Sequence, residues 1–213
     1  MKTDDLIDML ATGTEATDQS AIIRRSAAIL GWSVLMSSGI MYVLLGIRSD
    51  IGTAIFFPMF WIKLLFAFMV AAAAFAGVSR LARPGRQLGA TPYAMAFPVV
   101  LMWLLAFAVL AGTPEGLRLP LVLGRTWFVC PFLISLVSLP VFIAIFRIMK
   151  EMAPVHPALA GAAAGLFAGA TGAVIYCLHC PEMAAPFLAV WYLAGMLIPA
   201  AVGALVGHRL LQW

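Results

Sequence analysis

The chain has 213 residues, of which 64% are hydrophobic and only 10% are charged, against roughly 25% charged residues in soluble domains. This composition excludes a soluble globule with a polar surface and is typical of a polytopic membrane protein, whose apolar outside is solvated by lipid. The net charge of +4 does not indicate nucleic-acid binding, because the basic residues are spread over short segments and form no continuous patch.

The N-terminal segment, residues 1–25, is the only predicted cytoplasmic part that is long enough for a separate role. Five of the nine acidic residues lie in its first 20 positions, whereas a signal peptide would begin with basic residues and an apolar run. Residues 1–10 predict a short acidic amphipathic helix, which would be marginal alone in water and would order in a partner's groove. A frayed tail or an interfacial helix is the alternative, although interfacial helices usually carry Lys and Arg. The candidate partner-binding residues are Asp4, Asp5, Leu6, Ile7 and Leu10.

Six apolar runs of about 20 residues follow, each long enough to cross a bilayer. They predict an all-α fold, a polytopic bundle of six transmembrane helices that occupies residues 26–213. Proline and glycine residues lie in the gaps between the runs, as turn residues do. The predicted spans are Ser26–Ile47, Phe56–Val78, Tyr93–Ala111, Phe128–Phe146, Ala158–Leu178 and Pro186–Val206.

The distribution of basic residues predicts how the bundle is oriented. With the N-terminus inside, nine of the thirteen Lys and Arg residues lie on the cytoplasmic side and three lie in the outer loops. Cytoplasmic segments carry such an excess of positive charge. We therefore predict N-in and C-in topology. In a bacterium the outer loops would then face the periplasm, where disulfides can form.

Lys63, the remaining cation, lies inside the second predicted span. At about 1.5 Å per residue it is about seven residues, or roughly 10 Å, from the outer end of that span. A charge at this depth either faces the bundle interior and a partner or snorkels toward the interface, and both readings stay open. The candidate ion-pair partners are Asp50, Glu115 and Glu182.

Glycines repeat at every fourth position on the fifth and sixth predicted spans. Small residues at this spacing let two helix backbones approach closely in lipid. The pattern favours close packing within one monomer over a dimer face. The glycines concerned are Gly161, Gly165, Gly169, Gly203 and Gly207.

All three cysteines lie on the predicted outer side, at the open end of one antiparallel hairpin. Cys130 opens the fourth span, and Cys177 and Cys180 close the fifth with His179 between them, so we expect each thiol to lie near water. A disulfide, a metal site and a reactive thiol all remain open, and free cysteine is also a common apolar filler. The start of a helix, with Arg125 upstream, favours the thiolate of Cys130, whereas the other two lie near a helix C-terminus.

Catalytic patterns are missing from the sequence. It shows no paired carboxylates, no His-x-x-x-His motif, no glycine-rich phosphate loop and no Ser/His/Asp set. We therefore predict that the chain is not an enzyme and uses no cofactor. The spans hold almost no ionisable group besides Lys63, which argues against proton-coupled transport.

Four motifs, in order and spacing along the whole chain, resemble the NrsF family of six-span bacterial inner-membrane anti-sigma factors. The resemblance implies that the N-terminal segment holds an extracytoplasmic-function sigma factor and that Cys130 and Cys180 serve signalling, which leaves Cys177 without an assigned role. The cytosolic His-x-x-x-Cys-x-x-Cys zinc motif of another anti-sigma class is absent. The motifs are Met1-Lys2-Thr3-Asp4-Asp5-Leu6-Ile7, Phe60-Trp61-Ile62-Lys63, Cys130-Pro131, and Cys180-Pro181-Glu182 followed by Trp191-Tyr192-Leu193-Ala194-Gly195-Met196.

The combined hypothesis is an anti-sigma factor that holds a sigma factor at the inner membrane and releases it under thiol-reactive stress. Heavy-metal ions or oxidants would modify Cys130 and Cys180, which are also the candidate metal ligands, with Cys177 and His179 as further sensing candidates. Modification would shift span four against span five, and the glycine faces would pass this shift inward. The alternatives are a small metal-ion permease with the thiols as an entry relay, and a structural bundle with a disulfide staple.

Overall fold

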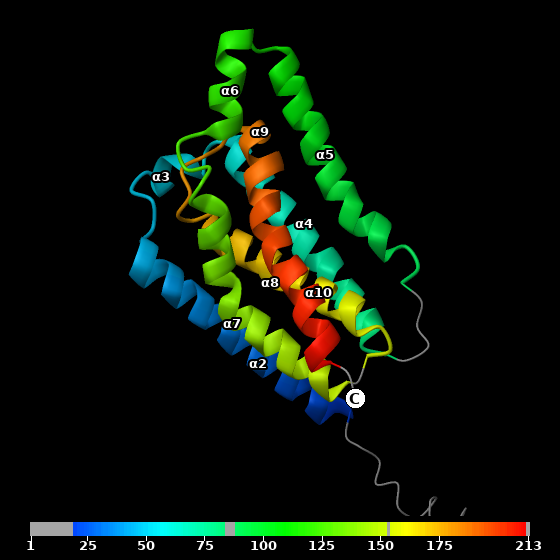
Figure 1. Cartoon of the computed structure of the whole chain (residues 1–213). Coiled ribbons are helices and arrows are strands. Elements are labelled where there is room, and N and C mark those ends of the chain that lie inside the picture. The colour runs from blue at the N-terminus through cyan, green and yellow to red at the C-terminus, as the bar shows by residue number, and fades with distance from the viewer. Residues whose placement is uncertain (1–18, 84–87, 153, 212–213) are drawn as a thin grey trace, which may run out of the picture.

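The computed structural model describes residues 19–83, 88–152 and 154–211, and these ranges contain helices and no strand (Figure 1). Six helices within them are long and apolar enough to cross a membrane. The predicted all-α bundle of six spans is therefore confirmed, and the chain is a multi-pass membrane protein. The predicted N-terminal helix and its candidate partner-binding residues lie outside the described ranges.

The six spans follow one another with only short segments between them. Five of them carry a proline in their first turn, where the missing N–H has no partner within the helix anyway. A four-residue helix, α3 (Ile51–Ala54), follows the first span, and α6 (Glu115–Leu123) lies between the third and fourth. The spans are α2 (Gln19–Ile40) with the π-helix η1 (Met41–Leu45), α4 (Pro58–Leu81), α5 (Thr91–Ala111), α7 (Cys130–Glu151), α8 (Pro157–Tyr176), and α9 (Ala185–Phe187) continued by the π-helix η2 (Leu188–Tyr192) and α10 (Leu193–Leu210).

Helix α8 forms the centre of the bundle and packs against α10, α4 and α7. A Cβ atom on Gly161 would collide with the carbonyl oxygen of Gly203, and one on Gly165 with that of Pro199. A Cβ atom on Gly207 would lie 2.6 Å from another main-chain oxygen, that of Pro157. The predicted close packing of spans five and six within one monomer is therefore confirmed.

Helices α2 and α5 are the peripheral spans. Only 17% of the residues in an apolar 18-residue stretch of each span are buried within the protein, against 61% for α8. Figure 1 shows α2 (blue) along the outer side of α7, in agreement with the contacts between them. Lipid therefore solvates most of the surface of the first span.

Consecutive spans run in opposite directions, so every second connecting segment lies at the same end of the bundle. The segments at the two ends differ in charge and chemistry. We call one the basic end and the other the cysteine end, which holds all three cysteines and the described cations Arg48, Arg118 and Arg125. The described cations of the basic end are Arg24, Arg25, Arg80, Arg83, Arg147, Lys150 and Arg209.

Candidate functional site

The three cysteines meet in one buried cluster at the cysteine end. Cys130 is the first residue of α7, whereas Cys177 and Cys180 belong to the segment 177–184 between α8 and α9, which we call the cysteine loop. The exposed fraction of each cysteine is 0%, and none of the three forms a disulfide. The expectation that the thiols lie near water is therefore wrong. The start of the sixth span folds over them, and its side chains Phe187 and Leu188 lie in the same apolar core.

Within this cluster the thiols of Cys130 and Cys180 are hydrogen-bonded to each other. The main chain holds both in place: Cys130 N donates to Thr126 O at 2.9 Å, and Cys180 N donates to Tyr176 O at 3.0 Å. The antiparallel hairpin therefore brings together the two sulfurs that the sequence singles out. Cys177 lies in the same cluster.

The environment of the cysteine loop favours a thiolate on Cys180. The hydrogen bond from Cys130 holds the pKa of the Cys180 thiol below its usual range, and the charge of Lys63 lowers it further, although burial opposes both. Burial instead raises the pKa of the Cys177 thiol to about 11. The sequence position pointed to Cys130 as the thiolate, but it carried no sign that a cation from another span faces Cys180.

Lys63 is completely buried and faces the cysteine loop from α4, which excludes snorkelling. Its Nζ donates to the main-chain oxygens of Cys180 at 2.9 Å and Glu182 at 3.0 Å. It also lies 4.8 Å from the centre of the Tyr192 ring, within reach of a cation–π interaction. The cation is thus held by carbonyl oxygens and an aromatic face.

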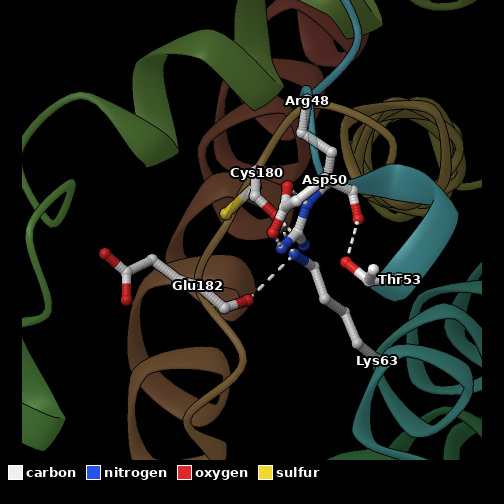
Figure 2. A network of polar contacts seen from close by, with 6 residues as sticks. All are labelled: Arg48, Asp50, Thr53, Lys63, Cys180 and Glu182. Carbon is white, nitrogen blue, oxygen red and sulfur yellow. Dashed lines mark hydrogen bonds and ion pairs between the residues drawn. The ribbon is translucent and has the colours of Figure 1, made fainter. Parts of the chain in front are cut away.

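The predicted carboxylate partners of Lys63 are engaged elsewhere. Figure 2 shows the Glu182 carboxylate turned away from Lys63; it accepts a hydrogen bond from the main-chain N of Arg125 at 2.8 Å. Asp50 pairs with Arg48 at 2.6 Å, and this hydrogen bond lowers the pKa of the Asp50 carboxyl. Glu115 lies 3.9 Å from Arg118. The candidate ion pair between Lys63 and Glu182 is not formed, because Glu182 contacts Lys63 through its main-chain oxygen and not through its carboxylate.

The end of the first span also binds the cysteine loop. The Arg48 side chain is 6% exposed, and its Nη1 donates to Cys180 O at 3.2 Å while its main-chain N donates to Leu178 O at 3.2 Å. His179 Nδ1 donates to Gly46 O at 2.9 Å. Arg48 and Lys63 therefore converge on one carbonyl oxygen, that of Cys180 (Figure 2).

His179 is turned toward Gly46, so its contact with the first span takes the place of a contact with the thiols. Among the described residues, no group of three or more His, Cys, Asp or Glu side chains is arranged to hold a metal ion. The tetrahedral site of three thiols and one imidazole is therefore not formed. Cys130 and Cys180 as a two-sulfur ligand for a soft ion stay a prediction.

Two aromatic residues of η2 complete the site, and sequence reasoning gave neither of them a role. The Tyr192 hydroxyl is buried with no hydrogen-bond partner in the described residues, although it is close enough to affect the ionisation of Cys177 and Cys180. Trp191 Nε1 donates to Val122 O of α6 at 2.9 Å. The π-helix thus places the Tyr192 ring against the thiols, and the preceding residue, Trp191, binds α6.

Comparison with known proteins gives a consistent result. Residues 10–213 match the family model described as negative regulator of sigma F. A probable anti-sigma-F factor NrsF from Azospira oryzae is 48% identical over 213 residues, and the anti-sigma-F factor NrsF of Caulobacter vibrioides is 35% identical over 215 residues; each alignment covers 100% of both chains. No solved structure matches the chain.

Proposed function

This chain belongs to the NrsF family of negative regulators of sigma F, and from that membership we propose how it acts. It is an anti-sigma factor, a regulatory protein and not an enzyme, and its partner is a sigma factor. In our proposal the partner is of the extracytoplasmic-function type. The chain holds it at the inner membrane and releases it when Cys130 and Cys180 are modified by oxidants or soft metal ions.

The observation that carries the sensing proposal is the hydrogen-bonded pair of Cys130 and Cys180. The thiolate is the form of cysteine that attacks oxidants and binds metals, and the surroundings favour it on Cys180. With hydrogen peroxide, the Cys180 thiolate attacks one peroxide oxygen and becomes a sulfenic acid, while hydroxide leaves and takes up a proton to form water. The Cys130 thiol then attacks the sulfenic sulfur, one S–S bond forms, and the sulfenic oxygen leaves as a second water with the thiol proton, so that two electrons pass to the peroxide. A soft divalent ion bridges the same sulfurs and displaces their protons.

The sigma-binding proposal rests on the N-terminal segment. Its sequence predicts a helix whose apolar stripe of Leu6, Ile7 and Leu10 would bind a partner's groove, with Asp4 and Asp5 beside that stripe. The segment leads into α2 at the basic end, and the excess of Lys and Arg at that end supports a cytoplasmic location under the positive-inside rule. Sensor and binding segment then lie on opposite sides of the membrane.

A sigma-dependent reporter in cells that carry the full chain tests both parts. Deletion of residues 1–20 should raise the unstimulated reporter to the level of cells that lack the chain. Replacement of both Cys130 and Cys180 by Ser should abolish the change in the reporter on addition of peroxide or cadmium, with Cys177→Ser as the matched control. A normal response of the double serine variant would refute the sensing proposal. Uptake of radiolabelled metal by vesicles would favour the permease alternative instead.

A further inference from the structure

The cysteine loop is fastened to the first two spans through main-chain atoms, and this arrangement suggests how the signal leaves the thiols. Three hydrogen bonds join the loop to residues 46–48 at the end of the first span, and two join it to Lys63 of α4. Two of these five bonds, one from Arg48 and one from Lys63, end on the carbonyl oxygen of Cys180, so only the bonds of one residue separate them from its sulfur. A displacement of Cys180 therefore acts directly on both spans.

The first span is the element best able to respond. A shift of α7 against α8 would have to break close contacts in the bundle centre, because a Cβ atom on Gly172 would lie only 2.9 Å from the carbonyl oxygen of Ile134. Helix α8 is likewise locked against α10 by its glycines. Helix α2 is peripheral and packs mainly along α7, so its movement disturbs fewer buried contacts than a movement of α7 or α8.

The connection between α2 and the cysteine loop is itself irregular. The span ends in the π-helix η1, and Gly46 follows with a positive φ of 75° that favours glycine. Single π-helical turns are rare and occur frequently at functional sites. The sixth span has its π-helix η2 beside the same loop. Both irregular turns of the described helices thus flank the thiol cluster.

We propose that Arg48 and Lys63 couple the state of Cys180 to the position of the first span, which carries the N-terminal segment. The inference rests on the proposed function and names the route of its signal. A disulfide brings two sulfurs to about 2 Å, closer than a hydrogen bond allows, so Cys180 moves toward α7 and its carbonyl moves with it. Modification also removes the thiolate that faces the buried ammonium of Lys63. Both changes weaken the hydrogen bonds that Arg48 and Lys63 donate to the Cys180 carbonyl, and the end of the first span is then free to move.

The test replaces the coupling side chains in the full-length protein and measures the unstimulated sigma-dependent reporter. Arg48→Ala removes the side-chain bond to Cys180 O, and Lys63→Met keeps the length of the side chain without its donors. Each should raise the reporter about 10-fold, the change in equilibrium that loss of one charged hydrogen bond corresponds to. The increase should persist with Ser at positions 130 and 180, because Arg48 and Lys63 act after the thiols. Arg48→Lys, which keeps a donor, should restore most of the repression.

Asp50→Asn is the matched control, because it weakens the ion pair of Arg48 and leaves the bond to the Cys180 carbonyl in place. Hydrogen exchange of residues 41–48 in nanodiscs supplies a local readout. Exchange should rise in Arg48→Ala and in peroxide-treated wild type, and it should stay unchanged in Asp50→Asn. Immunoblots of membranes normalise for the amount of protein, and Arg48→Ala keeps the test valid if Lys63→Met fails to fold.

The outcomes separate this inference from the proposed function. If cells without the chain show a high reporter while Arg48→Ala and Lys63→Met stay at the wild-type level, the coupling is wrong and the anti-sigma activity stands. If Asp50→Asn raises the reporter as much as Arg48→Ala, the Cys180 carbonyl is not the point of coupling. If removal of the whole chain leaves the reporter low, the proposed function itself fails.

Discussion

Lys63→Met should shift the pH at which Cys180 becomes reactive. The Cys180 thiol has a pKa below its usual range because it accepts a hydrogen bond from Cys130 and faces the ammonium of Lys63. An opposite charge within about 4–6 Å of an acidic group shifts its pKa by about 1–3 units, and Lys63 Nζ lies 2.9 Å from the carbonyl oxygen of Cys180. Loss of Lys63 should therefore raise the midpoint of the Cys180 titration by at least about one unit, or about 1.4 kcal/mol. Cys130→Ala, which removes the larger of the two causes, should raise the midpoint further.

The assay follows modification of Cys180 by methyl methanethiosulfonate from pH 5 to pH 10, with peptide-level mass spectrometry to separate the three cysteines. The midpoint must be compared and not the rate at one pH, because a thiolate of higher pKa is intrinsically more nucleophilic and partly offsets its lower population. Lys63→Arg keeps the charge and serves as the control. An unchanged midpoint in Lys63→Met would refute the assignment of Lys63 as a stabiliser of the thiolate.

Glu182→Gln should leave the Cys180 titration unchanged, because Lys63 binds the main-chain oxygen of Glu182 and not its carboxylate; a shift as large as that of Lys63→Met would contradict this contact. Cys177→Ser should leave the reporter response to peroxide intact. It should also remove little of the thiol labelling of the protein, because burial raises the pKa of Cys177; peptide mapping of labelled protein can verify this. Gly161→Ala should lower the melting temperature, since its Cβ meets the Gly203 carbonyl and overpacking costs about 1–3 kcal/mol. Gly31→Ala, with nothing within 4 Å, should be neutral or slightly stabilising, and equal melting temperatures for the two would argue against the tight α8–α10 contact.

The parts of the site that the sequence predicts are those governed by side-chain pattern. Apolar length fixes the six spans, and the alternation of span direction brings Cys130 beside Cys180. The glycine spacing likewise identifies the contact between α8 and α10. In each case one property of the side chains, read along the chain, decides the outcome.

The polar contacts of the site follow no such pattern, because they end on main-chain oxygens that every residue has. Arg48 counts in the sequence only as a charge that reports topology, yet it binds the carbonyl of Cys180. Lys63 suggests a carboxylate partner, since opposite charges attract, but two carbonyls and the Tyr192 ring hold it instead. Burial of the thiols was also missed, because it depends on how the sixth span folds back over the cysteine loop.

The energetics of Lys63 explain why such a site can act as a switch. Burial of an ammonium costs several kcal/mol, and in this structure carbonyl oxygens, an aromatic face and the neighbouring thiolate offset that cost together. Only the thiolate among these groups can be removed by chemistry at a single atom. Because the effective dielectric constant is lower in the interior than in water, the loss of that one charge changes the energy of the cation more than it would at an exposed surface. Because the thiols are buried, their modification therefore raises the free energy of the buried Lys63 ammonium and weakens the hydrogen bonds around it. The peripheral first span is the element whose movement can lower that free energy again.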